Sequence, residues 1–126
     1  MKRLFLFILC SLVGFASAVE YTVGSIPNPI TANAREFVSN PDGILKAETV
    51  QKMNEMIYAL KTERSAEVVI VAVNSIGQAD HVTFANQLFD AWKIGDAKQD
   101  NGLLILFVLD QRKIKFETGY GLEGVL

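Results

Sequence analysis

The sequence predicts an α/β fold in which helices cover both faces of a small mixed sheet, a three-layer α/β/α sandwich. Two short apolar runs, Glu67 to Val73 and Leu103 to Leu109, have the length and apolar character of buried strands. A segment with helical periodicity separates them. A strand, a helix and a second strand in this order form a parallel βαβ unit through a right-handed crossover.

Two segments have the periodicity of amphipathic helices. The first runs from Ala47 to Thr62, and its apolar residues recur every three or four positions: Val50, Met53, Met56, Ile57 and Leu60. The second begins after Asp80, a favourable N-cap residue, and ends before Gly95. Its apolar residues are Ala85, Leu88, Phe89 and Trp92. Each helix therefore has one face with which to cover the sheet.

A third strand is predicted at the edge of the sheet. Residues Lys113 to Thr118 alternate between polar and apolar side chains, as in a half-exposed strand. Only Asp110, Gln111 and Arg112 separate this strand from the preceding apolar run, so the two form an antiparallel hairpin. The lysines are expected to discourage pairing of this edge with other strands.

The first 18 residues have the features of a secretory signal peptide, with cleavage expected after Ala18. The apolar run from Leu4 to Phe15 is shorter than the ~20 residues that cross a bilayer as a helix. We therefore expect an exported protein, periplasmic or extracellular. Residues 19–39 are predicted to be an extended leader laid along a domain that spans residues 40–126, with ordered structure beginning at the Asn40–Gly43 turn.

Composition excludes several classes of site. Cys10 is the only cysteine and lies in the predicted signal peptide, so the processed chain would have no disulfide, zinc-thiolate site or thiol nucleophile. Removal of Lys2 and Arg3 leaves ten basic against 14 acidic residues, a formal charge of −4, which disfavours nucleic acid and tolerates cations. No GxGxxG motif follows a strand and opens a helix, so no nucleotide cofactor is expected.

Several motifs in a fixed order resemble the TPM domain family, which includes thylakoid-lumen proteins of photosystem repair and bacterial YgcG-like proteins. They are NPDGIL, AEVVIVAV, WKIG, DNG, DQRK and GYGLEG, and the similarity extends from Asn40 to Leu126. The resemblance implies a three-layer α/β/α fold, a calcium ion or other divalent cation in some members, and an acid phosphatase activity that is disputed. Because such domains are often followed by a transmembrane helix, we expect the natural protein to continue beyond Leu126 and to meet a membrane or membrane-protein complex through that segment.

The main candidate site is a divalent-cation site, with Ca²⁺ as the expected ion. GDAKQDNG places Asp96, Asp100 and Asn101 within six residues, and the returning strand brings Glu123 of GYGLEG to the same end of the sheet. Hard cations need several oxygen ligands on loops that fold tightly. The alternative is that Asn101-Gly102 is only a turn and that the glycines serve packing. The residues alone favour the turn, and the resemblance raises the weight of the cation site.

A secondary group is expected at the opposite end of the sheet, where open α/β sheets commonly bind ligands. It consists of Asp42, Asn74, Asp80 and Asp110, with Arg112 nearby as a possible clamp for a phosphate. Capping explains Asp80 and the hairpin turn explains Asp110, so we interpret this group as mainly structural. A serine-type triad is not expected, because Ser75 and the single histidine, His81, do not have the arrangement that such sites require.

Three functional hypotheses follow. The preferred one is an exported, cation-binding domain that acts in assembly, quality control or repair at a membrane surface. The second is a metal-assisted acid phosphatase in which Asp100 is a metal ligand or the nucleophile. The third is a structural domain whose acidic loops bind nothing.

Overall fold

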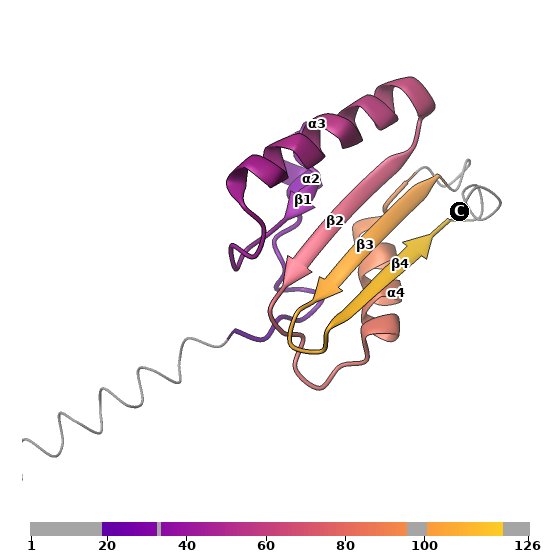
Figure 1. Cartoon of the computed structure of the whole chain (residues 1–126). Coiled ribbons are helices and arrows are strands. Elements are labelled where there is room, and N and C mark those ends of the chain that lie inside the picture. The colour runs from indigo at the N-terminus through magenta and orange to yellow at the C-terminus, as the bar shows by residue number, and fades with distance from the viewer. Residues whose placement is uncertain (1–18, 33, 96–100, 120–126) are drawn as a thin grey trace, which may run out of the picture.

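The computed structural model describes residues 19–32, 34–95 and 101–119. Its sheet has four strands in the order β1-β2-β3-β4 (Figure 1). The strands are β1 (Val38–Ser39), β2 (Glu67–Val73), β3 (Gly102–Val108) and β4 (Lys113–Thr118). Neighbouring strands are parallel from β1 to β3, and β4 is antiparallel to β3. The predicted mixed sheet is confirmed, with β3 displaced by one residue from its expected bounds.

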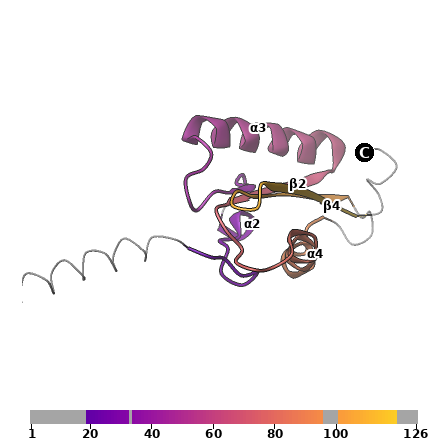
Figure 2. The ribbon, with the colours of Figure 1, turned by 60° about the horizontal axis from the view of Figure 1, so that its bottom comes forward.

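Helices lie on both faces of this sheet, which confirms the three-layer prediction. Helix α3 (Ala47–Arg64) covers one face, and α4 (His81–Trp92) covers the other together with the short helix α2 (Pro29–Ala32) (Figure 2). The side chain of Asp80 caps α4 as predicted, accepting a hydrogen bond from the Thr83 amide at 3.0 Å. Within the described ranges, no helix combines the length and the apolar character needed to cross a bilayer.

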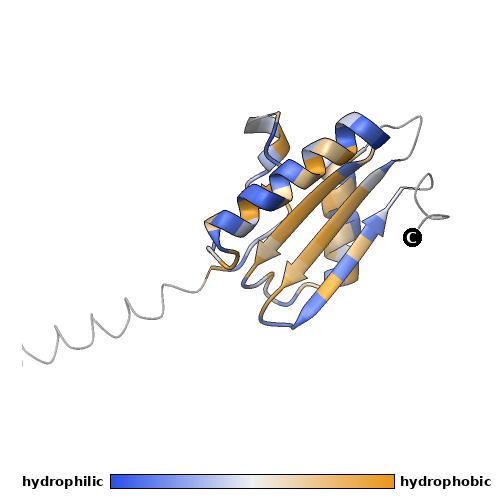
Figure 3. Cartoon of the chain, turned by 45° about the horizontal axis from the view of Figure 1, so that its top comes forward, coloured by the Kyte–Doolittle hydropathy of each residue, from blue (hydrophilic) through white to orange (hydrophobic). Residues whose placement is uncertain are grey.

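The core is divided between the two faces of the sheet. Residues at alternate positions of β2 and β3 point toward α4 and are at most 1% exposed: Val69, Val71, Val73, Leu104, Leu106 and Val108. On the α3 face, a second cluster joins Phe37 and Ile57 to Val68 and Ile70 of β2. Both central strands are therefore apolar almost throughout, and Figure 3 shows them as the most hydrophobic part of the sheet.

One prediction for α3 is wrong in part. Met56 and Leu60, which share the apolar stripe of the sequence, are 68% and 41% exposed. Ile57 is the fully buried residue of this helix, whereas Val50 and Met53 are partly buried against the core. Helix α3 therefore buries a narrower stripe than its sequence pattern indicates.

The expectation that ordered structure begins at Asn40 is also wrong. The predicted extended leader contains α2 and β1, and Val38 pairs in parallel with Ile70 of β2. Phe37 is 1% exposed and contributes to the core. A two-residue strand is too short to produce a periodic sequence signal. Its position depends instead on pairing with a strand 32 residues further along the chain.

Leu104 provides a test of this core. We expect Leu104→Ala to lower the free energy of unfolding by about 2–5 kcal/mol, because its fully buried side chain would leave a cavity between β3 and α4. The matched control is Leu109→Ala at a side chain that is 54% exposed, where a change of about 0.5 kcal/mol is expected. Urea unfolding followed by circular dichroism measures both. Equal losses for the two variants would contradict the assigned core.

Candidate functional site

Three glycines meet at the end of the sheet where β3 begins and β4 ends. The Gly119 amide donates a hydrogen bond to the Gly102 carbonyl at 3.0 Å. A side chain on Gly102 would collide with the Ile94 carbonyl, and one on Gly95 would collide with the backbone of Gly102. Gly95 also has a φ of +87°, which favours glycine. Close approach of backbone segments therefore accounts for the glycine in the Asn101-Gly102 pair.

Asn101 joins this end of the sheet to α3. Its backbone carbonyl accepts a hydrogen bond from the Glu67 amide at 3.1 Å. Its side-chain amide donates to the carbonyl of Ser65, the residue that caps the carboxyl end of α3 in a left-handed conformation. Of the four predicted cation ligands, Asn101 lies in the described part of the chain, whereas Asp96, Asp100 and Glu123 lie outside it.

The described residues that flank the other predicted ligands nevertheless converge. Gly95 and Asn101 bracket the segment with Asp96 and Asp100, and Gly119 precedes the segment with Glu123. Gly95 and Gly119 both lie against Gly102. The described flanks of the two acidic segments therefore lie at the same end of the sheet.

At the opposite end of the sheet, Asp42 is engaged with the N-terminal segment. One of its carboxylate oxygens accepts a hydrogen bond from the Tyr21 hydroxyl at 2.8 Å, and the other accepts from the Asn74 amide at 2.9 Å. The hydrogen bond to Asp42, together with partial burial, raises the pKa of the Tyr21 phenol above 10.0. Asp42 therefore fastens residues near Tyr21 to the carboxyl end of β2.

An open pocket of about 460 Å³ lies beside this contact. It is lined by Val19, Glu20, Asn74, Ser75, Leu109 and Asp110. The Asp110 amide donates to the Asn74 carbonyl at 2.9 Å, which holds the β3–β4 turn against the end of β2. The pocket thus brings a predicted residue, Asp110, together with a carboxylate that the sequence did not indicate, Glu20.

Glu20 was missed because it lies in the segment interpreted as a leader. The structural signal is Gly77, which has a φ of +67°. A Cβ there would lie 2.8 Å from the Glu20 carboxylate. The glycine therefore leaves room for an acidic side chain that is distant in the sequence.

The remaining secondary candidates have structural roles. The backbone and hydroxyl groups of Thr83 both donate to Asp80, which lowers the pKa of the Asp80 carboxyl below 3.8. Arg112 occupies the last position of the hairpin turn with a φ of 53°. It lines an apolar pocket of about 270 Å³ with Ile44 and Ile114. These positions support capping and turn formation, as the sequence predicts for Asp80 and Asp110.

The two candidate ends are separated by the full length of β3. Seven residues of strand span roughly 20 Å at about 3.3 Å per residue, so Asn101 and Arg112 lie at opposite ends of the sheet. A phosphate held by Arg112 could not also contact Asn101. Within residues 19–32, 34–95 and 101–119, no three His, Cys, Asp or Glu side chains gather in the manner of a metal site.

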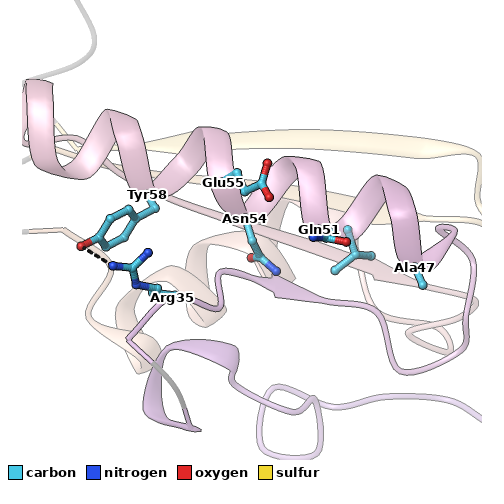
Figure 4. A pocket seen from close by; sticks show the side chains of 7 residues that line it. Arg35, Ala47, Gln51, Asn54, Glu55 and Tyr58 are labelled. Atoms are coloured by element: carbon cyan, nitrogen blue, oxygen red, sulfur yellow. Dashed lines mark hydrogen bonds between the residues drawn. The ribbon is translucent and has the colours of Figure 1, made fainter.

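A further hollow, of about 460 Å³, lies along α3 (Figure 4). Arg35 and Tyr58 face each other at one end, with the guanidinium carbon 4.1 Å from the ring centroid and an Arg35 nitrogen donating to the hydroxyl at 3.3 Å. Asn54 accepts a hydrogen bond from the Phe37 amide at 2.7 Å. These contacts tie the segment before β1 to α3 and explain the polar lining of the hollow.

Comparison with known proteins identifies the family. The model of the TPM domain matches residues 38–126, which is most of the chain. The chain belongs to the TPM domain family. This TPM domain is also similar to the solution NMR structure of the N-terminal domain of a protein from P. gingivalis, with a TM-score of 0.78 and 36% sequence identity over 85% of this chain and 68% of that chain. The search among curated proteins found no match.

The family match begins at Val38, the first residue of β1. The parallel pairing of β1 with β2 is therefore part of the region that this TPM domain shares with its family.

The Tyr21–Asp42 contact can be tested by titration. We expect Asp42→Ala to lower the pKa of Tyr21 toward 10.0, because the variant has no carboxylate to accept a hydrogen bond from the phenol. Near-ultraviolet absorbance follows the ionisation of the tyrosines. The difference between the titrations of the unmodified chain and of Tyr21→Phe gives the contribution of Tyr21. Because the native pKa is raised, the stabilisation from this contact is present below pH 10.0 and is lost as the pH rises through the native pKa.

Asp110→Ala is the matched control for this titration. Asp110 lies near Asn74, but the Tyr21 hydroxyl donates to Asp42, so the Tyr21 midpoint should remain in place. An unchanged midpoint in Asp42→Ala would show that the contact does not form in solution.

Proposed function

We propose that this TPM domain is exported and binds a divalent cation, with Ca²⁺ preferred, in an assembly, quality-control or repair role at a membrane surface. Asp96, Asp100, Asn101 and Glu123 are the proposed ligands. The observation that carries the proposal is the convergence of Gly95, Asn101 and Gly119 at one end of the sheet. These residues flank both acidic segments.

The donor set suits a hard cation. Three carboxylates and one amide oxygen are the ligand types that Ca²⁺ takes in proteins, and backbone carbonyls of the same loops can complete its coordination. Bound calcium would supply positive charge to an acidic region, where carboxylates otherwise repel one another. The glycines that flank the site give its backbone the freedom to turn tightly.

Export is supported by the pattern of the first 18 residues. The processed chain would have a formal charge of −4. An acidic module is attracted to an anionic membrane surface only through a cation or a protein partner. We therefore propose a membrane-protein complex, rather than bare lipid, as the partner.

A calcium titration tests the cation site. We expect amide chemical shifts to move at Asn101, Gly102 and Gly119 and in the flanking acidic segments, with a Kd on the order of 10⁻⁴–10⁻³ M, as in extracellular calcium modules. Asp100→Asn should weaken binding about tenfold, because it removes a charged ligand and keeps the shape of the side chain.

The control is Asp110→Asn, the same substitution at the opposite end of the sheet. It should leave the calcium affinity unchanged. Shifts confined to Glu20, Asn74 and Asp110 would move the site to the pocket at that end. No shift at millimolar calcium would rule out the cation proposal.

A metal-assisted acid phosphatase is the second candidate function. The open pocket beside Asn74 favours it, because about 460 Å³ can admit a phosphate ester and two carboxylates, Glu20 and Asp110, line the pocket. A metal held there would neutralise charge on the phosphoryl oxygens. The alternative position is the proposed calcium site, with Asp100 as ligand or nucleophile.

Hydrolysis of p-nitrophenyl phosphate separates the two functions. For the preferred function we expect no turnover above the rate without protein, with or without calcium. For the phosphatase, turnover should require metal and should fall by about 10² or more in either Asp100→Ala or Asp110→Ala, with far-UV circular dichroism unchanged. The variant that loses activity would identify the end of the sheet that carries the chemistry.

A further inference from the structure

Strand β4 is the edge of the sheet in the described part of the chain. The Gly119 amide donates to the Gly102 carbonyl, so these two residues form a hydrogen-bonded pair. Glu117 is opposite Leu104 two residues further along the ladder, and this pair is of the same kind. Hydrogen-bonded and non-hydrogen-bonded pairs alternate in an antiparallel ladder. The backbone groups of Ile114, Phe116 and Thr118 therefore point away from β3, toward the outer edge.

The same strand has an exposed apolar surface. Ile114 and Phe116 are each 53% exposed, on the face that they share with Ile105 and Phe107 of β3. Lys115 and Glu117 lie on the other face of the strand. Figure 3 shows this alternation along β4, in contrast to the continuous apolar character of β2 and β3. Among the described residues, this edge thus offers backbone groups that pair with no strand, an aromatic side chain and charges of both signs.

We propose that two copies of this chain associate through their β4 edges and form a continuous eight-stranded sheet. The strands pair antiparallel about a two-fold axis, with Phe116 opposite Phe116 of the second copy. The Ile114 positions then face Thr118. The outward backbone groups of these residues form about six hydrogen bonds, two for each hydrogen-bonded pair.

Charge complementarity selects this register. With Phe116 on the axis, Lys115 of each copy lies opposite Glu117 of the other, in the non-hydrogen-bonded pairs where Cα atoms approach to about 4.5 Å. A shift of the axis to Lys115 or to Glu117 places identical charges opposite each other. A shift to Ile114 places Lys113 opposite Lys115. Lysines that disfavour other edge pairings therefore favour this one.

Charge reversal tests the interface. A chain of residues 1–126 is expressed and purified as the host cell leaves it, and sedimentation velocity is measured from micromolar to millimolar concentration. We expect a reversible dimer. Lys115→Glu and Glu117→Lys should each raise its dissociation constant by about tenfold or more, because each converts two attractive pairs into two repulsive ones.

Two further samples make the test specific. The double variant K115E/E117K restores opposite charges across the axis and should return the dissociation constant to within about threefold of the original. An equimolar mixture of the two single variants should form a heterodimer, because all its cross-strand pairs are attractive. Glu63→Lys, the same charge change on α3, is the matched control and should leave the dimer unchanged.

Circular dichroism and the thermal midpoint establish that each variant is folded. A chain that stays monomeric at millimolar concentration would overturn the proposal. A dimer that is insensitive to both reversals, or that the double variant fails to restore, would place the interface elsewhere. Calcium-free buffer is used throughout, so the result is independent of the proposed cation site.

Discussion

The parallel pairing of β2 with β3 is the constraint on which the rest of this structure depends. The two strands are in register over seven residue pairs, from Glu67 with Gly102 to Val73 with Val108. Their side chains alternate between a core under α3 and a core under α4, so both faces of these two strands are covered by helices. Within β2 and β3 the side chains are consequently almost all apolar, and the charged side chains of the described sheet lie at the Glu67 end of β2 and along β4. This separation determines which residues can act together.

The two ends use their polar residues differently. At the carboxyl end of β2, Asp42 is already bonded to Tyr21 and Asn74, and the Ser39 hydroxyl donates to the Pro27 carbonyl at 2.6 Å. These contacts hold the N-terminal segment against the sheet. At the other end, Gly102 lies against the backbone of two further segments, and Asn101 bonds to the end of α3. The described residues Gly95 and Gly119, which flank the two acidic segments, lie against Gly102 at this end, and we place the cation proposal there for that reason.

Most of the architecture was predictable because its signals are local. The bounds of β2 and β4, and the capping of α4 by Asp80, follow from alternation, apolar runs and N-cap chemistry. The pairing of β1 with β2 was not predictable, because a two-residue strand has no period and its partner is distant in the sequence. Glu20 was missed for the same reason: its position follows from the Tyr21 amide bonding to the Ser75 carbonyl at 3.0 Å, a contact between distant segments.

The geometry also makes cation binding and edge pairing physically separable. Phe116, on the proposed two-fold axis, lies three residues before Gly119, the described residue that precedes the segment with the proposed ligand Glu123. In an antiparallel dimer the two Gly119 residues lie on opposite sides of the axis, roughly 20 Å apart along the strands at about 3.3 Å per residue. That distance exceeds the screening length of ~8 Å at physiological ionic strength, so the two acidic sites would interact weakly. Calcium would then bind each copy independently, and the β4 edge could pair whether or not the cation is present.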